Sequence, residues 1–225
     1  MLVRLGHSEE SRATAEDALA VFEDLGDRRG IARASFALGF LRHFSEGYEH
    51  GREHFERAIA TFREFEDQTH LMIRALGHLA ICAAYSSDVD RAWACCREAL
   101  QLDPDDVFGL WAEGILELNA GNHARAEASC DRALRRARAV GYDVLVAWLL
   151  RLHGAIACSQ EDYASAYGYE QESCRLYRKL GMPRHVMVGL CAFGAIAALR
   201  GDHKRSREDW AEAQAVATSM GWAAR

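Results

Sequence analysis

The sequence predicts an all-α protein built as an α-solenoid, a stack of antiparallel helix pairs with about 11 helices. Three observations support this fold class. Alanine occurs 39 times in 225 residues, whereas Val, Ile and Thr together occur 21 times, so good helix formers outnumber the usual strand formers. Only two residues are proline. Small residues also recur at intervals of about 40 residues, which is typical of helical repeats.

The small residues form three columns. Members of the first column are separated by 41, 34, 40 and 40 residues; the second column follows 12 residues later and the third a further 7. Because two helices approach closely only where side chains are small, we expect each repeat to be a tight pair of antiparallel helices. The columns are Gly39, Ala80, Gly114, Gly154, Gly194; then Gly51, Ala92, Ala126, Ala166, Ser206; then Ala58, Ala99, Ala133, Ser173, Ala213.

Capping residues set the expected helix boundaries. Four of the five residues that precede the second helices can accept a hydrogen bond from a free backbone N–H. Glycines that can adopt the left-handed conformation follow several of these helices. The start residues are Gly47, Asp88, Asn122, Asp162 and Asp202, and the closing glycines are Gly26, Gly141, Gly181 and Gly221.

These signals place every element in order. A leading helix covers about 8–25, within a segment 8–26, and carries the second-helix pattern. The first helices are expected at 30–45, 69–86, 107–120, 144–160 and 185–200. The second helices are expected at 48–65, 89–102, 123–140, 163–180 and 203–220. The repeats are then about 30–67, 69–104, 105–142, 143–182 and 183–222, in one repeat domain over 1–225.

The two ends lack a polar capping helix, which solenoids normally need for solubility. We therefore expect a segment of a longer protein, or a homo-oligomer that forms through its uncapped ends.

Composition excludes several classes of protein. The net charge of −6 and the pI near 5.9 argue against a dedicated nucleic-acid binder. No run of 18 apolar residues and no signal-peptide pattern occurs, so we expect a soluble cytoplasmic protein without a membrane partner. Seven cysteines without a C-x-x-C indicate core residues in a reducing cytosol, and neither disulfides nor a zinc ribbon.

The columns resemble the tetratricopeptide repeat over about residues 8–222. The closest repeat is 89–122, which has the run ALQLDPDD, the 34-residue spacing and the Gly121-Asn122 turn. The other repeats are stretched to about 40 residues, as in kinesin light chains and in the sensor arrays of large bacterial regulatory ATPases and transcription activators. The family's Trp and Tyr in the first helix are replaced here, and only Pro104 keeps the terminal proline.

The resemblance implies a concave groove lined by the first helices. A trough of aromatic rings beside three arginines would suit an amphipathic helix, or a ligand with flat apolar faces and acidic or hydroxyl groups; alternatively, the rings pack between repeats. The candidate binding residues are Arg33, Phe36, Phe40, His43, Arg74, Tyr85, Phe108, Trp111, Trp148 and Arg151, with Ile81, Ile115, Leu118 and Cys158 on the same face.

The three arginines of this face are candidate forks for a carboxylate or phosphate. The alternative is that Arg33, Arg74 and Arg151 pair with acids of neighbouring helices. Family members that grip a terminal carboxylate use Lys and Asn, and this chain has only two of each, which disfavours a chaperone-tail adaptor.

Signals for catalysis are weak. His50 to His54 matches H-x-x-E-H, but the repeat register explains Gly51 and Glu53, and no motif supplies a third zinc ligand. Nothing in the sequence lowers the thiol pKa of the Cys95-Cys96 pair. The basic strings at 135–138 and 204–207 are interleaved with acids, as on a solvated face. We therefore expect no enzyme, metal or cofactor.

The predicted function is a non-catalytic binding module. It would dock a protein or peptide, or sense a small effector, as the array of a bacterial signalling or transcription-control protein. Two alternatives are a self-associating structural scaffold and a domain that binds a small sugar-like or acid-like molecule.

Overall fold

The structure is a computed structural model that describes residues 8–45 and 47–221. These residues form eleven α-helices and two short 3₁₀ helices, with no strand in the described ranges. The helices are α1 (Ser8–Asp24), α2 (Arg28–Ser45), α3 (Arg52–Phe62), α4 (Thr69–Tyr85), α5 (Val89–Leu102), α6 (Val107–Asn119), α7 (His123–Ala139), α8 (Asp143–Ser159), α9 (Tyr163–Lys179), α10 (Pro183–Leu199) and α11 (His203–Ser219), with η1 (Tyr48–Gly51) and η2 (Glu66–Gln68).

The predicted all-α solenoid of antiparallel helix pairs is confirmed, and most boundaries agree within two residues. The exception is the helix expected at 48–65, which is η1 followed by α3 and ends at Phe62. Its start has no side-chain cap, because Gly47 and Gly51 carry no acceptor, and its first turn winds as a 3₁₀ helix. Past its end, Phe65 is extended, with φ −130° and ψ 105°.

Capping follows the sequence prediction at three helix starts. The carboxylates of Asp88, Asp162 and Asp202 each accept a hydrogen bond from the backbone N–H three residues later. Asn122 differs, because its Nδ2 donates to Glu117 Oε2 at 2.7 Å. The predicted closing glycines all have φ between 65° and 76°, which places them in the left-handed region.

The small-residue columns lie at helix contacts, as predicted. All fifteen members are buried. A Cβ at Gly39 would stand 2.9 Å from the Phe55 ring, and one at Gly194 would stand 2.5 Å from Trp210 Nε1. Since real Cβ atoms essentially never come closer than 3.0 Å, a side chain at Gly39 would have to displace the buried Phe55 ring, and one at Gly194 would have to displace the Trp210 side chain.

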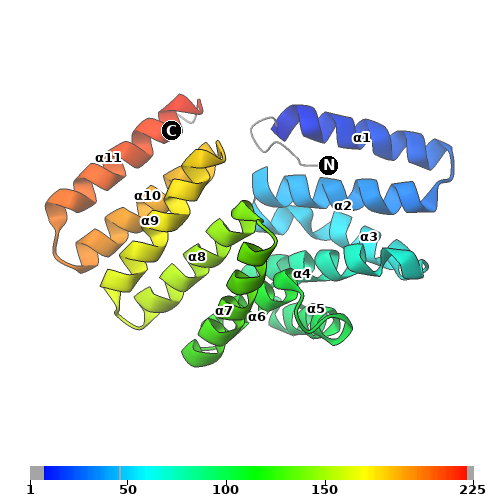
Figure 1. The fold of residues 1–225 in the computed structure, drawn as a ribbon. Helices are drawn as coiled ribbons and strands as arrows, with labels where there is room; N and C mark the ends of the chain where they lie inside the picture. The colour runs from blue at the N-terminus through cyan, green and yellow to red at the C-terminus, as the bar shows by residue number, and fades with distance from the viewer. Residues whose placement is uncertain (1–7, 46, 222–225) are drawn as a thin grey trace. The chain divides into compact units, whose positions relative to one another are not determined.

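The chain divides into two compact units, Met1–Ala133 and Leu134–Arg225. In the first unit α1 packs on α2, α2 on α3, and α3 on α4, which also contacts α5 and α6 (Figure 1). The prediction of one repeat domain over 1–225 stays a prediction. Its ends, 1–7 and 222–225, lie outside the described residues.

In the second unit α8 packs on α9, α9 on α10, and α10 on α11. Ala157, Ala166 and Ile196 form a buried cluster there, bordered by partly buried tyrosines of α9. The most enclosed helix is α8, whose buried face includes Leu145, Leu149 and Leu150.

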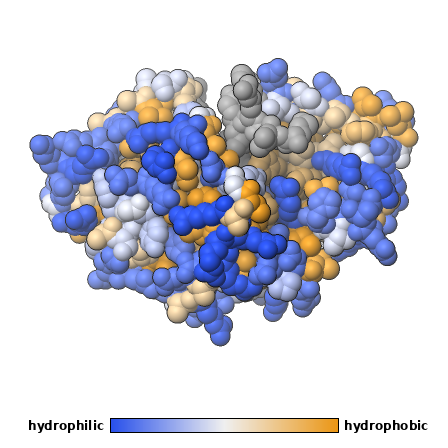
Figure 2. Space-filling model, viewed as in Figure 1, coloured by the Kyte–Doolittle hydropathy of each residue, from blue (hydrophilic) through white to orange (hydrophobic). Residues whose placement is uncertain are grey.

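Ion pairs between successive second helices repeat the spacing of the columns. Arginine and glutamate 34 or 35 residues apart pair in both units, and the partners are half-exposed, so each pair adds at most about 1 kcal/mol. The pairs are Glu23–Arg57, Glu56–Arg91, Arg63–Glu98, Arg138–Glu172 and Arg178–Glu212. Hydrophilic residues cover most of the face drawn in Figure 2, with scattered hydrophobic patches between them.

None of the seven cysteines, all of which lie in the described ranges, forms a disulfide; five are buried, and Cys158 and Cys191 are half-buried. In the part of the chain that the structure describes, none of the helices has the length and hydrophobicity that a membrane crossing requires.

Candidate functional site

The first helices of the first unit bring most of the predicted binding residues together, at very different depths. Arg33 on α2 and Tyr85 at the end of α4 are exposed. Phe36, Phe40 and Arg74 are half-buried. His43, Phe108 and Trp111 have exposed fractions of 2%, 2% and 4%, so their rings form part of the core.

His78, which the sequence analysis did not select, is the centre of this cluster. Its ring stacks on Phe55 with centroids 5.3 Å apart and planes 8° apart, and lies 4.8 Å from Phe108. Phe40 and His43 meet it edge-on at 5.5 and 5.3 Å. The signal that could have found it is a histidine inside the otherwise apolar run of 75–84.

Burial holds the pKa of His78 well below its ordinary value, and the nearby His43 and Arg74 lower it further. The imidazole is therefore neutral at neutral pH. Below about pH 6.5, His78 binds a proton in the unfolded chain but not in the folded protein. The free energy of unfolding is therefore unaffected by His78 above that pH and decreases as the pH falls below it.

We predict that acid destabilises the wild type through His78 by about 1.4 kcal/mol per pH unit below 6.5. The phenylalanine variant His78→Phe should show a shallower loss, measured by urea unfolding at pH 7, 6 and 5. The exposed His70 on the same helix supplies the control, since His70→Gln should follow the wild type. Parallel profiles for His78→Phe and the wild type would contradict the prediction.

Arg74 is held by aromatic rings. Its guanidinium lies 5.5 Å from the Phe36 centroid and 5.1 Å from the Phe108 centroid. Its Nε is buried, and the side chain makes no hydrogen bond or ion pair with the described residues. Cation–π contacts of this kind contribute about 0.5–2 kcal/mol and leave the fork available to an anion.

Arg33 has a neutral partner, and no ion pair with an acidic residue is seen among the described residues, where the alternative prediction expected one. Its Nε donates to Gln68 Oε1 at 2.9 Å. Gln68 is buried, and its Nε2 in turn donates to Asp67. The carboxylate of Asp67 pairs with Arg29, whose guanidinium lies 4.7 Å from the Phe65 centroid. Arg33 and Arg74 are therefore both positioned by groups other than a carboxylate of their own.

Two predicted binding residues belong to the second unit. Trp148 on α8 is buried, with 3% of its surface exposed, and Arg151 one turn later is half-buried. Arg151 acts electrostatically on Glu170 and on His185. Arg151 therefore lies near titratable side chains of α9 and α10.

The structure adds no support for catalysis at the H-x-x-E-H string of 50–54 or at the Cys95-Cys96 pair. His50 and Glu53 are exposed, and His54 is half-buried, on η1 and α3. Among the described residues, no group of three His, Cys, Asp or Glu is arranged to hold a metal ion. Burial raises the pKa of the Cys96 thiol to about 12, and its Sγ donates to Gly109 O at 3.5 Å, so this thiol is protonated and not nucleophilic.

A pocket that the sequence did not reveal lies where α3, α4 and α5 meet, with a volume of about 230 Å³. Ile59, Leu76 and Leu79 form its apolar floor. The ion pairs Glu56–Arg91 and Arg63–Glu98 border it.

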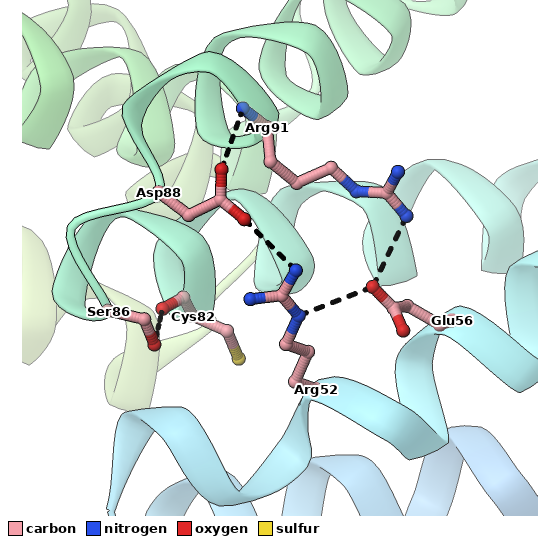
Figure 3. Close-up of polar contacts among 6 residues, drawn as sticks. All are labelled: Arg52, Glu56, Cys82, Ser86, Asp88 and Arg91. Carbon is pink, nitrogen blue, oxygen red and sulfur yellow. Dashed lines mark hydrogen bonds and ion pairs between the residues drawn. The ribbon is translucent and has the colours of Figure 1, made fainter.

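Figure 3 shows the ion pairs at the first of these borders. Glu56 accepts from Arg52 and from Arg91, while Asp88 accepts from Arg52 and caps the start of α5. The Arg52 guanidinium, bonded to Asp88 and Glu56, has its pKa raised by these contacts. Every charge drawn at this border is neutralised by a partner.

Comparisons with known proteins agree with this description. Residues 106–179 match the model of the tetratricopeptide repeat family. Among curated proteins, none matches the sequence.

Solved structures match in fold. BtubC (BKLC) from P. vanneervenii is 16% identical with a TM-score of 0.66, over 97% of this chain and 94% of that chain. Aspartyl phosphate phosphatase F from Bacillus subtilis is 14% identical with a TM-score of 0.62, over 89% of this chain and 55% of that chain. MamA from Desulfovibrio magneticus RS-1 is 16% identical with a TM-score of 0.52, over 86% and 97% of the two chains.

The fold defines a helical-hairpin repeat protein, a class whose members present extended binding surfaces. Residues 106–179 match the tetratricopeptide repeat family, so the resemblance predicted from the small-residue columns is confirmed there, and the solved structures share the fold.

Proposed function

We propose that the chain is a non-catalytic binding module, and that α2 and α4 of its first unit bind an acidic segment of a protein or peptide. The observation that carries this proposal is Arg74. Its guanidinium lies over the rings of Phe36 and Phe108, forms no ion pair or hydrogen bond with the described residues, and acts electrostatically on the carboxyl of the half-buried Asp106. On α2, Arg33 adds a second guanidinium group, and the half-buried Phe40 adds apolar surface.

The binding residues in this proposal are those that keep exposed surface. Arg33, Phe36, Phe40 and Arg74 would contact the partner directly. His43, Phe108 and Trp111 would support them from the core, because their rings are almost wholly buried. A carboxylate of the partner would take the open fork of Arg74, while its apolar residues would cover the exposed edges of the rings.

The test uses two amphipathic peptides of one length, alike except that Glu in one is replaced by Gln in the other. We expect the Glu peptide to bind more tightly, and Arg74→Ala to weaken it by about 10- to 100-fold, as expected for a lost charge-assisted hydrogen bond of about 1.5–3 kcal/mol. Fluorescence anisotropy at low salt measures both.

The matched control is Arg97→Ala, which removes an exposed arginine from α5 and should leave the affinity unchanged. Equal affinity of both peptides, or equal weakening by Arg74→Ala and Arg97→Ala, would show that the Arg74 fork does not select acidic partners. The place of the module in a signalling or transcription-control protein, a role as a scaffold, binding of a small effector and a cytoplasmic location all stay predictions.

A further inference from the structure

Glu170 occupies a position that the other repeats fill with residues suited to a core. The position lies four residues after the second small-residue column, where the other repeats carry Phe55, Cys96, Cys130 and Trp210. The first three are fully buried, whereas Trp210 is 47% exposed. On α9 this register turns the side chain toward the neighbouring helices, and only 5% of Glu170 is exposed. A carboxyl group therefore stands where the repeat pattern calls for a ring or a thiol.

On both neighbouring helices the carboxyl of Glu170 faces a glycine, which has no side-chain hydrogen-bond donor. On α8 it faces Gly154, where an added Cβ would lie 3.3 Å from Oε1. On α10 it faces Gly189, where an added Cβ would lie 3.9 Å from Oε2. Oε2 is buried and has no hydrogen-bond partner among the described residues. Two glycines leave room for the carboxyl, and neither has a side chain that could bind it.

The charges around Glu170 do not offset its burial. Arg151 of α8 favours the ionised form, but its effect on the pKa of Glu170 is smaller than that of burial. Cys158 of α8 and Cys174 of α9 also interact with Glu170, and burial raises the pKa of both thiols. Burial is the larger effect at Glu170 and raises the pKa of its carboxyl to about 7.

We propose that Glu170 is a proton-operated switch in the second unit, which holds α9 against α8 and α10 when its carboxyl is protonated and loosens these contacts when it ionises. A neutral carboxyl costs little in this apolar contact. Burying the ionised carboxylate of Glu170 without hydrogen-bond donors costs free energy, which is recovered when the group is hydrated. The conformation with α9 packed on α8 and α10 is therefore less populated as the pH rises. Local opening of α9 is the smallest rearrangement that hydrates the group.

His185 on α10 titrates in the opposite sense and must be separated from Glu170. Burial lowers the pKa of His185 to about 4, aided by Arg151 and Arg184. His185 does not reduce the free energy of unfolding above about pH 6.5, and it reduces that free energy increasingly as the pH falls toward 4. The two responses partly cancel between pH 4.5 and 6.5 in the wild type, so only the difference between the wild type and a Glu170 variant isolates the switch.

The experiment measures hydrogen exchange of α8, α9 and α10 in the full chain between pH 5 and 8, corrected for intrinsic exchange, for the wild type and Glu170→Gln. A carboxyl with a pKa of 4.5 when hydrated and about 7 when packed raises the opening constant about 70-fold over this range. Glu170→Gln should lack this rise. Glu172→Gln, which neutralises the surface partner of Arg138, should follow the wild type.

Identical pH profiles of the wild type and Glu170→Gln would overturn the proposal. Carbon-13 titration of the Glu170 carboxyl in the wild type gives a second readout that needs no variant. A midpoint near 7 supports the switch, and a midpoint near 4.5 overturns it. Because the readout concerns only the second unit, failure here leaves the binding proposal for α2 and α4 untouched.

Discussion

Replacing Phe55 with alanine is expected to lower the free energy of unfolding by about 3–5 kcal/mol, the usual cost of removing a fully buried ring from a core. Phe55 has no exposed surface. Its ring stacks on His78, and its ring centroid lies 5.9 Å from that of Phe36 and 6.0 Å from that of His43. Removing the ring therefore leaves a cavity at the centre of the aromatic cluster. Because Gly39 and Gly51 cannot fill the space with side chains, the cavity should persist. Urea unfolding followed by far-UV circular dichroism measures the loss.

Two further variants distinguish the cavity from a general loss of apolar residues. Phe55→Leu keeps most of the volume and should cost less than half as much. Phe65→Ala removes a half-buried ring outside the cluster and should also cost less. If Phe55→Ala lies within about 1 kcal/mol of the wild type, the cluster around His78 is not the core of the first unit.

The helix pairs could be predicted because each signal for them is local and recurs in every repeat. An aspartate such as Asp162 caps a helix through its own side chain, and a glycine such as Gly181 ends one through its own backbone. Where the local signal is missing, the prediction fails. The helix expected at 48–65 lacks a capping side chain at Gly47, and it begins instead with a 3₁₀ turn and is shorter than predicted.

The binding face was harder to predict, because burial depends on several helices together. The register placed Arg33 and Trp111 on one face, but the sequence does not show that Trp111 is covered while Arg33 is exposed. Nor does it show that Phe36 and Phe108, 72 residues apart, meet across Arg74.

Departures from the column pattern contain information that the sequence analysis left unused. Glu170 interrupts a core column with a carboxyl, and His78 interrupts an apolar helix with an imidazole. Both side chains are buried, and burial shifts the pKa of both toward the neutral form. A comparison of equivalent positions across the repeats would have identified Glu170 directly, since the other four positions hold Phe, Cys, Cys and Trp.

The contact between α4 and α6 supplies the second large effect, because it is built around Gly77. A Cβ at this position would stand 2.6 Å from Phe108 Cβ and 2.8 Å from Phe108 C, a backbone atom that cannot rotate away. Alanine normally stabilises a helix interior by about 1 kcal/mol relative to glycine. Overpacking costs about 1–3 kcal/mol, and the backbone contact puts this site at the upper end of that range. Gly77→Ala should therefore lower the free energy of unfolding by about 2 kcal/mol.

Gly168 on α9 offers a control with the same substitution and the opposite expected sign. It is exposed, and an added Cβ would meet nothing within 4 Å, so only the gain in helix propensity remains. Gly168→Ala should raise the free energy of unfolding by about 0.5–1 kcal/mol, and the melting temperatures of the two variants should move in opposite directions. A stabilising Gly77→Ala would mean that α4 and α6 do not approach as closely as the Phe108 contact requires.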